Sequence, residues 1–199
     1  MTAIRTLVLC NFILMGALPS IVFRRADRFS LMWWVTAAPF LVCGRLVAVA
    51  RSGELAPSIA YGGYLAVIAA AATIVCSAFS FALILAAWRV HRQPPALWHQ
   101  PDDQPAALVT GGPYVHIRHP LYAAYLLALI AALLAVPHPA TATALLSGWA
   151  LLEITARREE RRLCASPLGG EYVAYMRRTG RFWPRLVARR TALAEGAVT

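Results

Sequence analysis

The chain has 199 residues, enough for one domain, and it is too apolar for an ordinary soluble protein. Hydrophobic residues make up 59% and charged residues 14%, whereas soluble domains average about 45–50% and 25%. The composition therefore predicts an integral membrane protein. The formal net charge is +10. We assign the basic excess to cytoplasmic loops and anionic lipids, because no basic domain stands clear of the apolar segments to bind nucleic acid.

Five apolar stretches are candidate membrane helices, and the last two are short. Such a helix needs about 20 mostly apolar residues. The candidates are 4–23, 31–50, 59–88, 121–136 and 140–154. Pro137-His138-Pro139 separates the last two. Because proline ends one helix and suits the first turn of the next, this link predicts a tight antiparallel helical hairpin.

Arginine placement predicts the orientation of these spans. The loop 24–28 carries three arginines and the segment from Arg157 onward carries ten, whereas the loop 51–57 has one arginine and one glutamate. Cytoplasmic loops carry the excess of basic residues. We therefore expect the C-terminus and loop 24–28 in the cytoplasm, and loop 51–57 and the N-terminus outside.

The rest of the chain is predicted to contain an irregular connector, two helical segments and a disordered tail. The segment 91–111 is rich in Pro, Gln and Asp and reads as an irregular connector that could fold over a site. The fifth helix should run past Ile154 into the cytoplasm, followed by a short amphipathic helix around 171–178 and a disordered tail from Ala188. We expect membrane helices in 1–88 and a flexible tail in 188–199.

A first polar cluster stands at the start of the fourth apolar stretch, where two histidines, an arginine and two tyrosines fall within nine residues. Charge is costly near hydrocarbon, so such a cluster indicates a functional site. Arg118 and His119 precede Pro120, which suits a helix start. The helix N-terminus and the Arg118 fork would attract an anion. The alternative is that Tyr114, His116 and Arg118 are interfacial anchors.

A second polar cluster follows the fifth apolar stretch. Glu153, Arg157 and Glu160 share one helical face, and Glu159 or Glu160 could accept hydrogen bonds from an ammonium group. Tyr172 and Tyr175, three residues apart, could close the site with their rings. The alternatives are a solvated, salt-bridged helix and an amphipathic helix whose tyrosines pack onto the membrane.

The two clusters carry a family resemblance that covers about residues 88–186. The motifs are Leu108-Val109-Thr110-Gly111-Gly112-Pro113-Tyr114, Arg118-His119-Pro120-Leu121-Tyr122, Glu159-Glu160, Tyr172-Val173-Ala174-Tyr175 and Arg181-Phe182-Trp183-Pro184. In this order and spacing they resemble the isoprenylcysteine carboxyl methyltransferase family. Phospholipid N-methyltransferases share the Arg-His-Pro-x-Tyr run and the paired glutamates.

The resemblance implies that residues 89–187 form a cofactor-binding catalytic half, which binds S-adenosylmethionine without a Rossmann fold. It implies that Arg118 and His119 lie at the carboxylate end of the cofactor and that Glu159 or Glu160 meets its amino group. The implied pocket lining is Tyr114, Pro120, Tyr122 and Leu163, with Tyr172 and Tyr175 also expected in the site.

The chain departs from the family pattern at three places. Ala124 stands where the family commonly has glycine two residues after the tyrosine, Leu168-Gly169 replaces the usual Phe-Gly, and Pro167 is an extra residue. None of these removes a charged group, so they bear on substrate geometry more than on cofactor binding.

The reaction implied by the resemblance is methylation of a lipophilic acceptor. The leading expectation is carboxyl O-methylation of an isoprenylcysteine-like substrate. Arg181 could then orient the acceptor carboxylate. An amine acceptor would need a base, for which Glu153 or His116 is the candidate. The alternatives are phospholipid or other small lipophilic N- or S-methylation, a reductase resembling the sterol reductases that uses NADPH, and a small channel or scaffold. We expect no metal and no nucleic-acid partner.

Overall fold

The computed structural model describes residues 1–22, 31–90 and 108–185, and the side chains of 1–16, 37–90 and 108–185. Over these residues every secondary-structure element longer than a single bridge is helical, as predicted. The elements are α1 (Thr2–Val22), α2 (Leu31–Ser52), α3 (Gly63–Val90), a 3-10 turn η1 (Gly112–Val115), α4 (Pro120–Ala135), α5 (Pro139–Cys164) and α6 (Gly169–Arg178). Loop 24–28, most of the expected connector and the tail from Ala188 lie outside the described residues.

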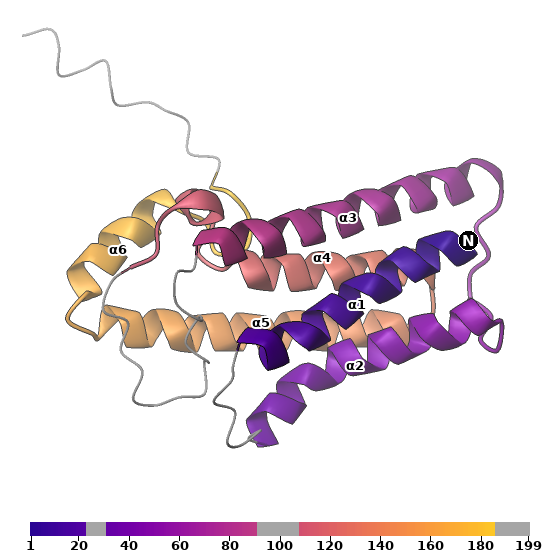
Figure 1. Ribbon diagram of the computed structural model, residues 1–199, viewed down its shortest axis with the longest axis horizontal. Coiled ribbons are helices and arrows are strands. Elements are labelled where there is room, and N and C mark those ends of the chain that lie inside the picture. The colour runs from indigo at the N-terminus through magenta and orange to yellow at the C-terminus, as the bar shows by residue number, and fades with distance from the viewer. Residues whose placement is uncertain (23–30, 91–107, 186–199) are drawn as a thin grey trace, which may run out of the picture.

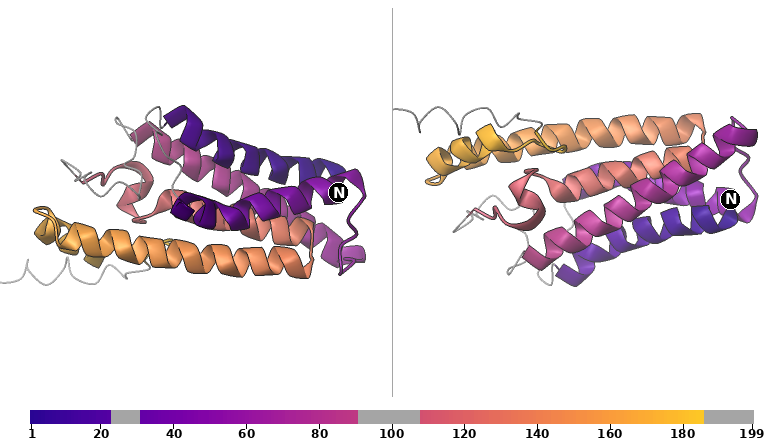
Figure 2. Two further views of the ribbon diagram at one scale, coloured as in Figure 1. Left: turned by 90° about the horizontal axis from the view of Figure 1, so that it is seen from below. Right: turned by 90° about the horizontal axis from the view of Figure 1, so that it is seen from above.

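Five long helices form an elongated bundle in which successive helices run in alternating directions (Figure 1). The N-terminus lies at one end of the bundle, and η1 and α6 lie at the other (Figure 2). Helix α4 contacts α1, α2, α3 and α5. Its buried residues are mostly alanines, which let neighbouring backbones approach closely. Helix α4 is therefore central in the bundle, and its first residues lie at the end where η1 and α6 are found (Figure 1).

Prolines set the boundaries of α4 and α5, as the sequence predicts. Pro120 and Pro139 occupy first-turn positions, where a missing N–H leaves no hydrogen bond unmade. His138 adds a reciprocal cap, because its Nδ1 accepts from Ala140 N at 3.1 Å and its own N–H donates to Thr141 Oγ1 at 3.2 Å. Only residues 136–138 separate the two helices, so α5 runs back alongside α4 (Figure 2).

Among the described residues, only α3 is long and apolar enough to cross a membrane by length and composition. Its 28 residues extend about 42 Å. The 16 residues of α4 reach only about 24 Å, short of the roughly 30 Å hydrocarbon core. Large apolar side chains stand exposed along α3, as suits contact with lipid: Leu65, Val67, Ile68, Ile74, Val75 and Phe79. The other four spans remain predictions.

Ala124, one of the departures from the family pattern, lies fully buried where α4 packs against α3. Its carbonyl accepts a hydrogen bond from the Ser80 hydroxyl at 2.8 Å. The same hydroxyl lies 3.0 Å from Asn11 Oδ1 on α1. The methyl group of Ala124 is therefore accommodated inside a polar junction of three helices.

Candidate functional site

The paired glutamates are carried on one unbroken helix. Helix α5 continues to Cys164, ten residues beyond the end of its predicted apolar part, as the sequence indicates. Glu153, Glu159 and Glu160 therefore keep fixed relative positions along α5, at the end of the bundle where α6 and η1 lie (Figure 1).

The first polar cluster is joined to the C-terminal segment by backbone pairing. We call residues 179–182 the strap. The strap runs parallel to residues 116–119, with a bridge between Ile117 and Gly180. Arg118 N donates to Gly180 O at 2.8 Å, Gly180 N donates to His116 O at 3.1 Å, and His119 N donates to Arg181 O at 3.0 Å. The two backbone amides that immediately precede α4 are therefore used by the strap.

Gly180 is required by the path of the strap. A Cβ at this position would lie 1.7 Å from the Trp183 carbonyl oxygen, far inside van der Waals contact. Gly112 has a comparable role at η1, because its φ is +56° and an added Cβ would meet Val90 Cγ2 at 2.5 Å. The chain therefore turns at Gly112, where η1 begins.

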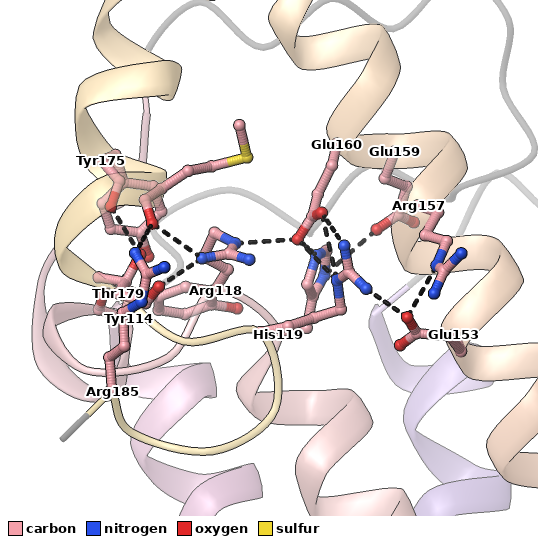
Figure 3. Close-up of polar contacts among 12 residues, drawn as sticks. Tyr114, Arg118, His119, Glu153, Arg157, Glu159, Glu160, Tyr175, Thr179 and Arg185 are labelled. Carbon is pink, nitrogen blue, oxygen red and sulfur yellow. Dashed lines mark hydrogen bonds and ion pairs between the residues drawn. The ribbon is translucent and has the colours of Figure 1, made fainter.

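Arg118 connects three elements through one guanidinium group (Figure 3). Its Nε donates to Glu160 Oε1 at 2.9 Å. Its Nη1 donates to the Met176 carbonyl at 3.3 Å and to the Thr179 carbonyl. These carbonyls lie in the last turn of α6 and just beyond it, where a cation is favourable. The anion-binding fork expected from the sequence therefore meets an anion supplied by the chain itself.

Glu160 is the centre of the charged network. Its Oε1 also accepts from Arg181 Nε at 3.1 Å, and its Oε2 accepts from Arg181 Nη2 at 2.6 Å and Nε at 3.2 Å. Glu160 is 6% exposed. Burial by itself would raise the pKa of this carboxyl, but contacts with His119, Arg181 and Arg118 outweigh burial and hold its pKa far below the usual range.

Arg181 bridges two of the three glutamates on α5. Besides Glu160, it donates through Nη1 to Glu153 Oε1, and the same oxygen accepts from Arg157 Nε at 2.8 Å. Hydrogen bonding to Glu160, more than the opposing effect of burial, raises the pKa of Arg181. An acceptor carboxylate at Arg181 would have to share this guanidinium with the glutamates.

Glu159 lies beside His119 and Tyr122. The Tyr122 hydroxyl donates to Glu159 Oε1 at 2.7 Å, and His119 Nδ1 lies 3.4 Å from Glu159 Oε2. The His119 and Tyr122 rings stack with centroids 5.2 Å apart. Burial raises the pKa of Glu159, and His119, Tyr122 and Arg162 only partly offset that effect.

His119 Nε2 lies 3.4 Å from Glu160 Oε1, too far for a good hydrogen bond. Within the described part of the chain, this buried nitrogen has no hydrogen-bond partner. Buried polar atoms are rarely left unpaired in folded proteins, and exceptions often mark functional positions. His119 therefore has capacity for a further contact.

Tyr175 links α6 to η1, and Tyr172 packs against Tyr175. The Tyr175 hydroxyl donates to the Tyr114 carbonyl at 2.6 Å, and the Tyr172 and Tyr175 rings lie 5.9 Å apart. Both rings are buried, and burial raises the pKa of Tyr175 to about 12. The two side chains therefore help to pack α6 and η1 beside the charged network.

The structure does not bring every predicted residue into the network. The His116 side chain is exposed, and Leu163 is partly exposed near the end of α5. Pro120 is buried at the start of α4.

Two residues that contact the network had no role predicted from the sequence. Phe182 packs edge-on against His119 and Tyr122, and the Thr179 carbonyl binds Arg118. The Arg181-Phe182-Trp183-Pro184 motif contains Phe182 and could have indicated a role for it.

The donor set suits the amino-acid end of S-adenosylmethionine, a zwitterion that needs both cationic and anionic partners. Arg118, Arg181 and His119 stand against Glu159 and Glu160, and the unpaired His119 nitrogen offers a contact. A hollow of about 540 Å³ beside α6 includes Tyr175 and no other predicted site residue in its lining. The described residues contain no group of three or more His, Cys, Asp or Glu side chains placed to hold a metal.

Comparison with known proteins identifies one family. The model of the isoprenylcysteine carboxyl methyltransferase (ICMT) family matches residues 96–165. The matched range contains Arg118 and His119 and both glutamates of the pair, and it ends before the strap. No curated protein and no solved structure matches the chain.

Proposed function

We propose that this chain, a member of the isoprenylcysteine carboxyl methyltransferase family, transfers a methyl group from S-adenosylmethionine to a lipophilic acceptor. The observation that carries the proposal is the charged network at one end of the bundle. Two arginines, a histidine and two adjacent glutamates from the matched range and the strap converge there. The network supplies both signs of charge that the cofactor needs.

In the proposed site, Arg118 and His119 stand toward the carboxylate end of the cofactor and the glutamate pair stands toward its amino group. Tyr114, Pro120, Tyr122, Leu163, Tyr172 and Tyr175 complete the proposed lining. When bound, S-adenosylmethionine supplies a methyl group already activated by its sulfonium. The protein then needs to align the acceptor and exclude water more than to move protons.

The acceptor that fits best is a carboxylate, as in an isoprenylcysteine. A carboxylate needs no base, and Arg181 is a cation next to Glu153, the glutamate of the three that lies nearest the apolar part of α5. Phe182 and Tyr122 would shield the reacting end from water. An amine acceptor, as in phospholipid N-methylation, would use Glu153 as base. His116 is the less suitable base, because its side chain is exposed away from the network.

We further propose that the protein is multi-pass and that the network faces the cytoplasm. The support is the exposed apolar surface of α3, the alternating helix directions and the arginine-rich sequence after residue 157. Residues 1–88 would anchor the protein and 89–187 would form the catalytic half.

The deciding experiment is calorimetric binding of S-adenosylhomocysteine and of NADPH to the full-length protein in detergent, followed by methyl transfer to a small prenylated cysteine. We expect S-adenosylhomocysteine to bind and NADPH not to bind. His119→Ala should weaken binding by roughly tenfold or more, the effect of losing one charge-assisted hydrogen bond. Binding of NADPH alone would favour the reductase and refute the proposal.

A further inference from the structure

The two adjacent glutamates of α5 have opposite environments. Glu160 is 6% exposed, and three N–H groups of Arg118 and Arg181 make four hydrogen-bond contacts with it, because the Arg181 Nε–H is shared between both carboxylate oxygens. A carboxylate offers about four lone-pair sites. The acceptor capacity of Glu160 is therefore filled by the chain itself.

Glu159 retains acceptor capacity. Among the described residues it accepts one hydrogen bond, from the Tyr122 hydroxyl, and its second oxygen has a 3.4 Å contact with His119. Its side chain is 26% exposed, against 7% for Glu160. Its raised pKa, caused first by burial, agrees with a carboxylate that has too little positive charge nearby.

We propose that Glu159, rather than Glu160, receives the ammonium group of the cofactor, and that Glu160 is a positioning residue. This inference rests on the proposed function and assigns roles within the same site. An ammonium group brings three donors and a positive charge. Glu159 can accept hydrogen bonds from this ammonium group while it keeps the hydrogen bond from the Tyr122 hydroxyl.

At Glu160 the same ammonium would have to displace a guanidinium donor. Loss of the Arg118 contact would release the link to the α6 carbonyls, and loss of the Arg181 contact would release the strap. Glu160 therefore acts through Arg118 and Arg181, by holding the strap and α6 beside the start of α4.

The test compares two ligands on two matched variants, Glu159→Gln and Glu160→Gln. The ligands are S-adenosylhomocysteine and its deaminated form, in which hydrogen replaces the amino group. Wild-type protein should prefer the amino form by about tenfold or more. Glu159→Gln should lose this preference and bind both forms with similar affinity. Glu160→Gln should weaken both ligands together and keep the preference.

Each outcome decides the question. A preference retained in Glu159→Gln, or lost in both variants, overturns the division of roles while wild-type binding still supports the proposed function. Failure of the wild type to bind either ligand refutes the proposed function instead. Should Glu160→Gln not fold, the two ligands on Glu159→Gln alone decide whether Glu159 meets the amino group.

Discussion

Arg118 and Glu160 stand 42 positions apart in the sequence, yet Arg118 Nε donates to Glu160 Oε1 at 2.9 Å. The contact joins the start of α4 to the far part of α5. Because Arg118 also binds the last carbonyls of α6, one side chain holds three elements together. The residue that the sequence marks as an anion binder is thus also an organiser of the site.

Replacing Arg118 should destabilise the protein even when the positive charge is kept. A lysine ammonium cannot reproduce the planar fork that reaches Glu160 and the α6 carbonyls at once. Charge-assisted hydrogen bonds contribute about 1.5–3 kcal/mol, which for a chain of this size is roughly 3–12 °C in Tm. We expect such a loss for both Arg118→Lys and Arg118→Gln in thermal unfolding. The control is Arg158→Gln, at an exposed position on α5, which should leave Tm nearly unchanged. A wild-type Tm for Arg118→Lys would contradict the organising role.

Gly180→Ala should disrupt the strap. The added Cβ would lie 1.7 Å from the Trp183 carbonyl oxygen, and backbone atoms cannot move aside without breaking the pairing with 116–119. We expect a large fall in Tm together with loss of cofactor binding. Gly170→Ala is the matched control, because its Cβ meets nothing within 4 Å and alanine suits a helix better than glycine. Similar behaviour of the two variants would show that the strap tolerates other paths.

Local signals in the sequence were sufficient for much of the fold. The prolines at 120 and 139 predicted two helix starts, and the charged extension after Ile154 predicted that α5 continues. Such features depend on neighbours within a few residues. The five spans could not be settled in the same way, since α4 is too short to meet the length criterion and α5 becomes charged along its course.

The site was predictable as two clusters but not as a network. Spacing along a helix placed Glu153, Arg157 and Glu160 on one face, and the structure shows the Glu153–Arg157 ion pair. The strap pairs residues more than sixty positions apart through backbone atoms, which leave no mark on residue type. The contrast between Glu159 and Glu160 depends on burial and on donors from other elements, so adjacent identical residues could not be told apart.

The two glutamates should have opposite effects on stability as pH changes. The folded protein lowers the pKa of Glu160, so its stabilisation is fully present above about pH 4.3, the unfolded value, and is lost as pH falls through the folded pKa. The folded protein raises the pKa of Glu159, so its contribution is present below about pH 4.3 and is lost as pH rises through the folded pKa.

At pH 7 we therefore expect Glu160→Gln to lower Tm and Glu159→Gln to leave it unchanged or raise it. The Glu159→Gln difference should shrink as pH falls through the raised folded pKa of Glu159, whereas the Glu160→Gln difference should begin to shrink only below about pH 4.3. Thermal unfolding at several pH values in an uncharged detergent measures this. His119, Tyr122 and Arg162 also act on Glu159, so an Arg162→Gln control should raise the Glu159 pKa further. A stabilised Glu160→Gln at neutral pH would contradict the assignment.

The proposed orientation places residue 54 outside and residue 195 in the cytoplasm. Single cysteines at these positions, in a background lacking the four native cysteines, can be labelled with an impermeant reagent in intact cells. We expect labelling at 54 and protection at 195 until the cells are opened. The reverse pattern would invert the topology and place the charged network outside.

The acceptor should be lipophilic and should reach the site from the bilayer rather than from water. The charged network lies at one end of the bundle, where a soluble cofactor can enter, whereas the apolar surface of α3 and the alanine-rich α4 suit contact with lipid. A substrate panel of prenylated thiols, fatty acids and water-soluble analogues with the same reactive groups tests this. Turnover should rise with chain length for the lipophilic members because each buried methylene contributes about 0.8 kcal/mol. Equal turnover of soluble and lipophilic acceptors would contradict entry from the bilayer and would leave the cofactor site unaffected.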